Sequence, residues 1–555
     1  MISKDDNGFF FRIKAFFACN EKRRFCFALA FLGAVLAAGL ALYSDYGLSW
    51  DELAERRSGL VSAYSLVKLI SYGTPLTFSE QHGVVGYDRF YGMGFQHILL
   101  AAEYLKCGTV SPGSPLPYDL WLLRHAVNFF FVWCGLAALF FTGKLLWKNS
   151  FSALVPVVLF LTIPRFWAES FFNSKDLPLL AAFMISGYFL LRMVRRPSAG
   201  SVAAFAVSAA FASSVRLTGG IIFIAGVILI AAAGEMKIRR RAVWVAEMAA
   251  AAAAALVLFY PSSWINPPQF FIEAVRYMVS HPWNGGVLFC GKSYLASNVP
   301  WYYLPIWMAV TLPVPLMLFF AAGHFDVRRI FSGSGSRFRK RSRLFFYLLF
   351  YLSFFAVVLK CGTFYNGWRQ FYFLAYPLIM ISADGVIYIF RRFRRNRTAC
   401  TVLKALVAVW LLTTAAWMVC VHPYQNLFFN VLAGDPNGKF ELDYWHTSER
   451  KALEYIAAKS AFEREKAVVA LNTTNYFTSE ILHPGSRKHI GIISQDCFCR
   501  YFIYFDRPQW RPEDGGRPFN VPFRTSVKCL KEFYCSSSLF LHKVFLCRIY
   551  EFTLP

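Results

Sequence analysis

Eleven apolar stretches, each about as long as a helix that crosses a lipid bilayer, constrain the fold of this sequence more than any other feature. A transmembrane helix needs roughly 20 predominantly apolar residues, with a range of about 17–25. The third and fifth stretches are short, and the fifth and sixth could form one re-entrant pair. The sequence therefore predicts a polytopic α-helical membrane protein with about 11 transmembrane helices. The predicted spans lie near 25–43, 121–143, 150–167, 176–194, 201–215, 217–234, 243–261, 301–322, 344–360, 371–390 and 402–421.

The composition agrees with a chain whose main solvent is lipid. Hydrophobic residues make up 57% of the 555 positions and charged residues 16%, against about 25% charged residues in a typical soluble protein. A formal net charge of +26 would suggest a nucleic-acid partner in a soluble protein. Here the cations lie in short runs between apolar stretches, as in loops that orient a membrane protein. Membrane lipids are the expected surroundings, and no nucleic-acid partner is expected.

Lys and Arg are concentrated in every second connection between the predicted spans. Because cytoplasmic loops carry an excess of these residues, the N-terminus is predicted to be cytoplasmic. A wrong number of spans would break the alternation, so the alternation also supports the predicted count. The basic connections lie at 14–24, 144–148, 192–196, 237–241, 328–343 and 391–397. The loops predicted to face outside are 44–120, 164–175, 262–300 and 361–370, together with everything after about 421.

Two domains follow from this topology. Residues 1–421 form a transmembrane domain whose first external loop covers 44–120, and residues 422–555 form an external domain. The external domain is predicted to be a small α/β domain, with a helix over 447–459 and strands over 467–471, 501–505 and 539–551. The first apolar segment could instead be a cleaved signal peptide, which would leave the topology of the rest unchanged.

Two adjacent carboxylates, Asp51 and Glu52, follow the first predicted span by a few residues. One carboxylate can act as a general base while the other orients it. The alternative is a solvated loop start or a helix N-cap, because Ser49 and Asp51 precede an apolar-periodic run over 53–69. Helices are predicted over 53–70 and 90–105 in this loop, along the membrane surface. A long loop of this kind is typical of an active-site cover.

The second external loop, 164–178, combines Arg165, Glu169, Lys175 and Asp176 with several aromatic residues. Ionisable groups at membrane depth are costly and favour a functional interpretation. Anchoring at the membrane interface by aromatic and charged side chains is the alternative.

Two further cations stand alone on the predicted outer face. Arg216 is the only charged residue between Arg196 and Glu235, and Arg369 lies at the start of the tenth span. Arg prefers bidentate contacts to phosphate or carboxylate. With Arg165 and Lys175, these residues favour a dianionic sugar-phospholipid as ligand, since surface lipid favours loose cation clusters over single residues among aromatics.

The order and sidedness of these motifs resemble the C-type glycosyltransferase superfamily. Within it, the chain is most similar to family 39, which includes protein O-mannosyltransferases and bacterial aminoarabinose lipid A transferases. The resemblance covers roughly 25–450. The matching pieces are 50–52, 164–178, 365–371 (Tyr365-Asn366-Gly367-Trp368-Arg369-Gln370-Phe371), 422–425, which begins with His422, and 440–445, which contains Asp443 and Tyr444.

The resemblance implies transfer of a sugar from a polyprenyl-phosphate donor to an acceptor hydroxyl, with a protein, a lipid or another glycan as acceptor. It implies Asp51 as the catalytic base and Glu52 as the second member of the acidic pair. A positioned carboxylate can accept the hydroxyl proton, and cations can stabilise the leaving phosphate. The expected phosphate contacts are Arg369, Arg216, Arg165 and Lys175, and the expected supporting residues are Asp176, Tyr365, Asn366, His422, Asp443 and Tyr444.

One departure from the family concerns the late external loop. The family commonly has Asp-Gly-Trp-Arg-His where this chain has Asn366-Gly367-Trp368-Arg369-Gln370. This removes a carboxylate and an imidazole, so the acceptor and the use of a divalent metal stay open, and no other cofactor is expected. The resemblance also implies a bacterial inner membrane, with the last domain in the periplasm.

Two other functions are compatible with a polytopic protein. A transporter or lipid flippase would predict inverted repeats and charges near the middle of the bilayer. The sequence has no convincing internal repeat, and its distinctive charges gather at one predicted face. A membrane scaffold would not need Asp51 or the charged loop at 164–178.

Overall fold

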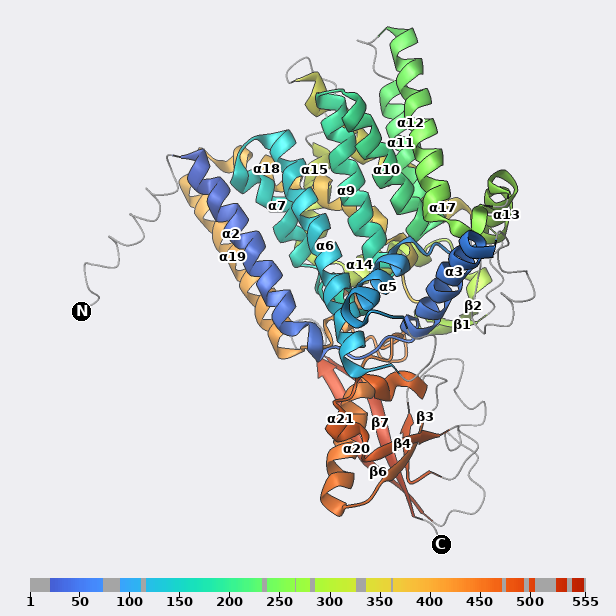
Figure 1. Cartoon of the computed structure of the whole chain (residues 1–555). Coiled ribbons are helices and arrows are strands. Elements are labelled where there is room, and N and C mark those ends of the chain that lie inside the picture. Colours follow the sequence, from blue (N-terminus) through green and yellow to red (C-terminus); the bar gives the residue numbers. More distant parts are fainter. Residues whose placement is uncertain are drawn as a thin grey trace.

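The computed structural model combines a bundle of apolar helices with a smaller domain at the C-terminus (Figure 1). The bundle carries the C-terminal domain at one end, which we call the domain end. The structure describes residues 20–72, 90–110, 116–231, 237–264, 266–279, 285–325, 336–360, 363–471, 476–493, 499–504, 526–536 and 542–553.

Every predicted span coincides with helical structure over its described residues, and residues 232–234 of the sixth span lie outside them. In the described part of the chain, seven helices are long and apolar enough to cross a membrane, or up to nine if each of two bent pairs is one span. These findings confirm a polytopic helical membrane protein. The long helices are α2 (Glu21–Leu42), α6 (Tyr118–Trp147), α9 (Asp176–Arg195), α12 (Ile238–Phe259), α17 (Arg337–Lys360), α18 (Ala375–Phe393) with the 3-10 turn η5 (Arg369–Leu374) before it, and α19 (Arg397–Cys420). Two shorter apolar helices are α10 (Ala199–Val215) and α11 (Gly220–Ala231).

Two predicted spans are bent rather than continuous. Helix α7 (Ser150–Leu161) and helix α8 (Pro164–Phe172) meet at 75°, and α14 (Tyr303–Thr311) and α15 (Val314–Phe325) meet at 115°. Proline explains both breaks, because it lacks the N–H that a helix interior needs. Pro164 occupies the first turn of α8 and Pro313 precedes α15. The first bend carries Arg165 and Glu169 on a short helix instead of a long span.

Both helices predicted in the first external loop are present at the domain end (Figure 1). Helix α3 spans Glu52–Tyr72 and helix α5 spans Gly94–Cys107. The segment after α12 holds features that the sequence did not indicate. They are helix α13 (Pro267–Val279) and the antiparallel hairpin of β1 (Gly286–Phe289) and β2 (Lys292–Leu295).

The C-terminal domain is a sheet covered by helix α20 (Glu449–Glu463). Among the described residues the sheet has five strands in the order β4-β3-β5-β7-β6. Strand β3 pairs in parallel with β4 and β5, whereas β7 pairs antiparallel with β5 and β6. The predicted α/β class is therefore confirmed, although β4 and β6 were not predicted. The strands are β3 (Ala467–Leu471), β4 (Ile490–Ile493), β5 (Tyr501–Tyr504), β6 (Ser526–Ser536) and β7 (Lys543–Thr553); the predicted strand residues 505 and 539–541 lie outside the described residues. A four-residue helix α21 (Pro484–Arg487) precedes β4.

Short 3-10 turns connect these elements. They are η1 (Tyr43–Asp45), η2 (Leu217–Gly219), η3 (Pro261–Ser263), η4 (Ala296–Asn298), η6 (Gln425–Leu427), η7 (Val431–Ala433) and η8 (Tyr476–Ile481).

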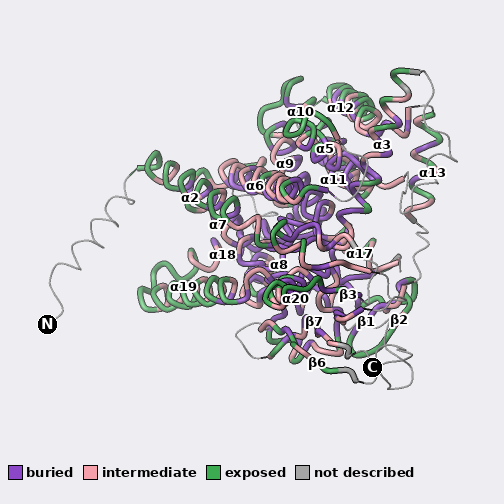
Figure 2. The backbone as a smooth tube through the Cα atoms, turned by 60° about the horizontal axis from the view of Figure 1, so that its bottom comes forward, coloured by how far each residue is buried: buried purple, intermediate pink, exposed green. Residues whose placement is uncertain are grey.

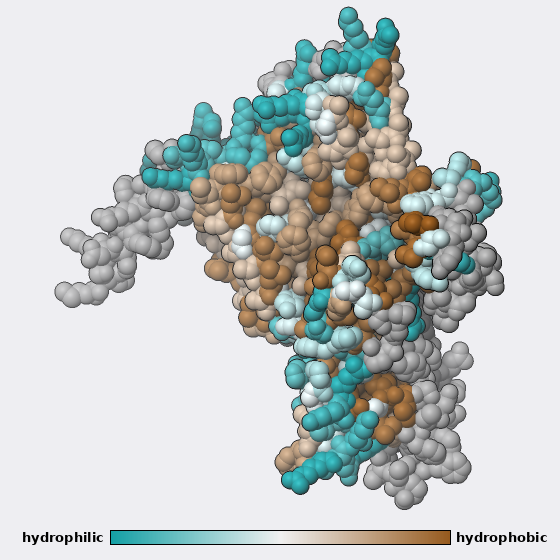
Figure 3. Space-filling view, in the orientation of Figure 1, coloured by the Kyte–Doolittle hydropathy of each residue, from teal (hydrophilic) through white to brown (hydrophobic). Residues whose placement is uncertain are grey.

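The bundle's core lies around α9 and the η5–α18 segment. We compare the buried share of an apolar stretch of 18 residues in each span. This share is 72% in α9 and 78% in η5–α18, but only 6% in α19 (Figure 2). On the face shown in Figure 3, the bundle has a hydrophobic band with hydrophilic residues at both ends, as expected for a protein surrounded by lipid.

The chain between α19 and α20 joins two cores. Phe429 and Phe440 belong to the core of the bundle, whereas Tyr424 and Leu427 pack in the core of the sheet domain. The predicted domain boundary between 421 and 422 stays a prediction. The chain between α19 and α20, which we call the joining segment, packs against both the bundle and the sheet domain.

Candidate active site

Asp51 and Arg369 lie together at the domain end, although 318 positions separate them in sequence. Asp51 comes immediately before α3, and Arg369 begins η5. The Nη1 atom of Arg369 donates a hydrogen bond to Oδ2 of Asp51 at 2.8 Å. The side chain of Arg369 is 3% exposed and that of Asp51 is 23% exposed. The carboxylate of Asp51 is thus anchored on one side and accessible on the other.

Asp176 is a second carboxylate in the same cluster, at the start of α9. Its Oδ1 lies 2.6 Å from Nη2 of Arg216, and its Oδ2 lies 3.6 Å from Nη1 of Arg369. The side chain of Asp176 is fully buried, and Asn173 accepts a hydrogen bond from its backbone N–H at 2.8 Å. Asp176 therefore bridges two of the predicted phosphate-binding cations and fixes their separation.

Three aromatic rings surround the Arg369 guanidinium. Its carbon lies 5.1 Å from the ring centre of Tyr365, 5.0 Å from that of Tyr444 and 4.6 Å from that of Trp445. Cation–π contacts of this kind contribute about 2 kcal/mol or more when they are desolvated. The predicted supporting residues Tyr365 and Tyr444 thus hold Arg369 in place, and Trp445 was not predicted.

A left-handed turn positions Arg369. Asn366 and Gly367 have φ values of 53° and 65°, which favour glycine or asparagine. The N–H of Asn366 donates to Oε2 of Glu441 at 3.0 Å. A side chain at Gly367 would place its Cβ 3.2 Å from the Trp307 ring. Asn366 therefore supports the site through its backbone, which the sequence comparison did not indicate.

Lys175 lies at the edge of the cluster, paired with Glu55. Its Nζ is 3.5 Å from Oε1 of Glu55 and 3.9 Å from the ring centre of Tyr91. Burial raises the pKa of Glu55 and lowers the pKa of Lys175, while each residue opposes the shift of the other. Glu55 was not predicted, although its spacing of four residues from Asp51 places both on one face of a helix.

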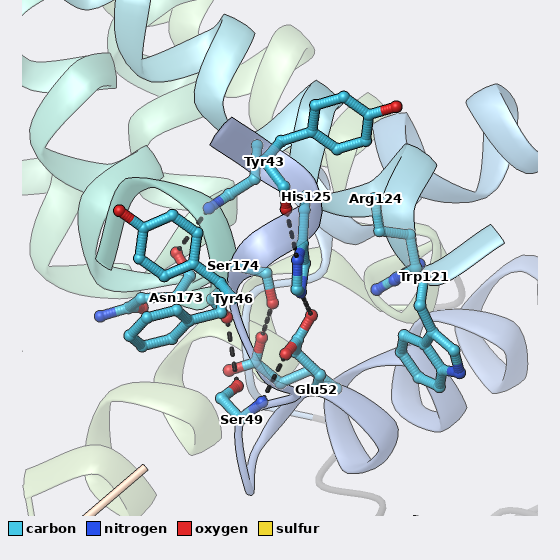
Figure 4. A network of polar contacts seen from close by, with 12 residues as sticks. Tyr43, Tyr46, Ser49, Glu52, Trp121, Arg124, His125, Asn173 and Ser174 are labelled. Atoms are coloured by element: carbon cyan, nitrogen blue, oxygen red, sulfur yellow. Dashed lines mark hydrogen bonds and ion pairs between the residues drawn. The ribbon is translucent and has the colours of Figure 1, made fainter. Parts of the chain in front are cut away.

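Glu52 points toward Ser49 and His125 (Figure 4). One carboxylate oxygen accepts the backbone N–H of Ser49 at 2.6 Å, and the other lies 3.1 Å from Nε2 of His125. In the first contact, the Glu52 carboxylate accepts the backbone N–H of the residue three positions earlier, as the glutamate of a capping box does at the start of a helix. At this place Glu52 can hold the start of α3, and Asp51 with it.

Three further predicted residues lie outside the cluster. Arg165 donates to the carbonyl oxygen of Phe428 at 3.2 Å, so it binds the joining segment. Nε2 of His422 lies 2.9 Å from Oδ2 of Asp45. Asp443 accepts the backbone N–H of Ser448 at 2.9 Å, and burial raises its pKa. The contacts of Arg165 and His422 join the bundle to the segment between α19 and α20, whereas the contact of Asp443 lies within that segment.

The described residues contain no group of three or more His, Cys, Asp or Glu side chains arranged to hold a metal ion. Asp51 and Asp176 converge, but Arg369 occupies the space between them. The possible divalent metal stays a prediction.

A cavity of about 330 Å³ lies beside the cluster. Arg216, Tyr91 and Gln370 contribute to its lining. An apolar groove of about 220 Å³ lies between α11 and α17 and shares Ile221 and Ala356 with the cavity. The two spaces therefore adjoin, with Arg216 in the wall of the cavity and apolar side chains along the groove. Such a site suits a ligand with an anionic head and a long apolar chain.

No family model matches the chain, and no curated relative matches it. Among solved structures, ArnT from Cupriavidus metallidurans bound to undecaprenyl phosphate is similar, with 14% identity over 85% of this chain and 86% of that chain. The TM-score is 0.49. Values this low establish no shared activity.

Proposed function

We propose that the chain is a membrane glycosyltransferase that takes its sugar from a polyprenyl-phosphate-linked donor. The acceptor is a hydroxyl group of a protein, lipid or glycan. The observation that carries this proposal is the convergence of Asp51 and Asp176 with Arg369 and Arg216, next to a cavity that adjoins an apolar groove. A carboxylate base, cations for a phosphate and a seat for a lipid chain are what this transfer requires.

The reaction follows from this placement. Asp51 takes the proton of the acceptor hydroxyl as the hydroxyl oxygen bonds to the anomeric carbon of the sugar. The bond between that carbon and the phosphate oxygen breaks, and polyprenyl phosphate leaves as an anion. Arg369 and Arg216 stabilise the charge that develops on the leaving phosphate, with Lys175 as a further contact. The phosphate competes with Asp51 for Arg369, so donor binding frees the base.

The groove between α11 and α17 is proposed to hold the donor's isoprenoid chain. Its lining is aliphatic and aromatic apart from Ser353. Burial of apolar chain surface stabilises binding by roughly 25 cal/mol per Å² in water, a driving force that is weaker within a bilayer. We therefore expect the groove to contribute little to the affinity for the donor and mainly to align the donor's phosphate with the cations.

The sidedness of the site is part of the proposal. Basic segments such as the Arg192–Arg195 end of α9 lie at the end of their helices opposite the cluster at Asp176. Cytoplasmic loops are rich in Lys and Arg. We therefore propose that the domain end, and the reaction, lie on the periplasmic face of a bacterial inner membrane.

The test compares wild type with Asp51→Asn in lipid nanodiscs. The assay measures release of sugar from a panel of polyprenyl-phosphate sugars, with membrane glycan extract as acceptor. We expect turnover to fall by about 100-fold or more in the variant, while donor binding persists. Asp45→Asn is the matched control, because Asp45 lies at the same end but pairs with His422.

Equal turnover in wild type and Asp51→Asn would refute Asp51 as the base. Wild type that transfers no sugar but moves the donor lipid between leaflets would refute the transferase proposal and establish a flippase.

A further inference from the structure

Glu55 lies beside the candidate active site but has no part in the reaction as proposed. It follows Asp51 by one turn of α3, and its N–H donates to the carbonyl oxygen of Asp51 at 2.9 Å. Its side chain is 9% exposed. It accepts hydrogen bonds from Nε2 of Gln96 at 3.0 Å and from the Ser174 hydroxyl. A buried carboxylate with this many partners has a defined direction, and it points at Lys175.

Lys175 has two different neighbours on its two sides. Glu55 lies 3.5 Å from its Nζ, and the ring of Tyr91, which lines the cavity, lies 3.9 Å away. The side chain of Lys175 is 12% exposed. An ammonium group this far from water needs a counter-charge to stay protonated.

We propose that Glu55 is a positioning residue that keeps the Lys175 ammonium charged and against Tyr91, a residue of the cavity wall, where the ammonium binds the phosphate of the donor. The inference rests on the proposed function, because it takes the ligand's phosphate from that proposal. Glu55 touches no reacting atom; it acts through Lys175.

The surroundings of Glu55 keep this arrangement rigid. The Oε1 atom of Gln96 accepts a hydrogen bond from Nη2 of Arg124 at 2.7 Å, and Arg124 pairs with Glu103 at 2.7 Å. Glu103 also pairs with Arg56 at 2.8 Å, and all three charged side chains are at most 2% exposed. This buried network fixes α5 against α3 and α6. Gln96, on α5, is therefore held in place as a hydrogen-bond donor to Glu55.

The segment that carries Tyr91 is fixed as well. A Cβ on Gly92 would lie 2.3 Å from the carbonyl oxygen of Ser214, and one on Gly94 would lie 2.0 Å from the Ser214 hydroxyl. Only glycine permits this approach to the end of α10. Tyr91 and Glu55 therefore flank the Lys175 ammonium from two closely packed segments.

Removal of the Glu55 charge has a predictable sign. The charged groups that remain around Lys175 are Asp51 and Asp176, which favour its protonated form, and Arg216, which opposes it. Burial already lowers the pKa of Lys175, and loss of Glu55 lowers that pKa further. Lys175 in a Glu55→Gln variant thus loses its charge as pH rises through a range where wild type keeps it.

The experiment measures the Kd of the full chain for undecaprenyl phosphate in nanodiscs, at about pH 6 and about pH 8.5. Glu55→Gln should bind about 10-fold more weakly than wild type at the higher pH and recover to within about threefold at the lower pH, because a charge-assisted contact contributes roughly a tenfold change or more. Lys175→Met should lose affinity equally at both values. The double variant should match Lys175→Met alone.

Additive losses in the double variant, or an equal loss at both pH values in Glu55→Gln, would show a general structural role and overturn the inference. Wild type that fails to bind undecaprenyl phosphate would instead overturn the proposed function. Ser174→Ala keeps the Glu55 charge and removes one hydrogen bond to it, so it serves if Glu55→Gln does not fold. Ser174→Ala should weaken the binding of undecaprenyl phosphate by about threefold when it is the only substitution, and it should not change the affinity of the Lys175→Met variant.

Discussion

At the residue scale, the cluster combines charges so that every cation has a carboxylate before the donor arrives. Arg369 binds Asp51 and Asp176, and Arg216 binds Asp176. A buried ion left without a partner costs several kcal/mol. The carboxylates therefore keep the phosphate-binding cations charged and ordered in the absence of ligand, and the donor's phosphate replaces one contact with another of the same kind.

Arg369→Lys tests whether geometry or charge matters at this position. A lysine keeps the charge but has no planar fork to reach two carboxylates and stack on three rings. We expect turnover to fall by about 10- to 100-fold, with the affinity for undecaprenyl phosphate reduced in proportion. Kinetic measurements on the purified variant give both values.

Arg343→Lys is the matched control for that substitution. Arg343 makes a bidentate contact to Asp384, with both distances 2.9 Å, and it lies on α17 near its N-terminal end. The control should lose stability but keep the affinity for the donor lipid. Similar loss of affinity in both variants would show that any buried arginine supports binding only through the fold.

At the element scale, the sequence predicted the features that depend only on residues close to one another along the chain. Apolar length predicted the helices, and Pro164 supplied a signal for the break before α8 that span counting passed over. The Asp51 and Arg369 motifs were found as separate pieces. The pair of Glu55 with Lys175 could not be found, because it depends on how α3 packs against the turn before α9. Packing of that kind is absent from periodicity and composition.

The groove between α11 and α17 permits a prediction about chain length. Ala225→Trp places a large side chain in the groove, which Ala225 lines. We expect the variant to bind long polyprenyl phosphates about 10-fold more weakly and a short-chain analogue with unchanged affinity, since only the long chain fills the groove. Binding is measured with the two lipids in the same nanodiscs.

Leu406→Trp controls for the change in hydrophobicity, because Leu406 lies on α19 and is 63% exposed. If Ala225→Trp binds the long polyprenyl phosphate as tightly as wild type does, the isoprenoid chain lies elsewhere.

At the scale of the whole molecule, the sheet domain is docked on the bundle by buried polar contacts. Oε2 of Glu480 accepts hydrogen bonds from the N–H of Leu116 and from Nε1 of Trp121, both at 2.9 Å. Glu480 is 3% exposed. Arg450 of α20 donates to the carbonyl oxygen of Tyr46 at 3.0 Å. The domain therefore holds the joining segment, and with it the rings of Tyr444 and Trp445, against Arg369.

Glu480→Ala should weaken this docking and, through it, the active site. The substitution leaves two buried N–H donors without an acceptor, at a cost of about 1–3 kcal/mol. We expect a lower unfolding midpoint, faster proteolysis of the sheet domain and a turnover reduced by about 3- to 10-fold, because Arg369 loses part of its aromatic support. Glu532→Ala is the control, since Glu532 forms a half-exposed ion pair with Arg548 that contributes little to stability. Unchanged turnover in Glu480→Ala, despite a loosened domain, would show that the bundle alone positions Arg369 and that the sheet domain serves another purpose, such as binding the acceptor.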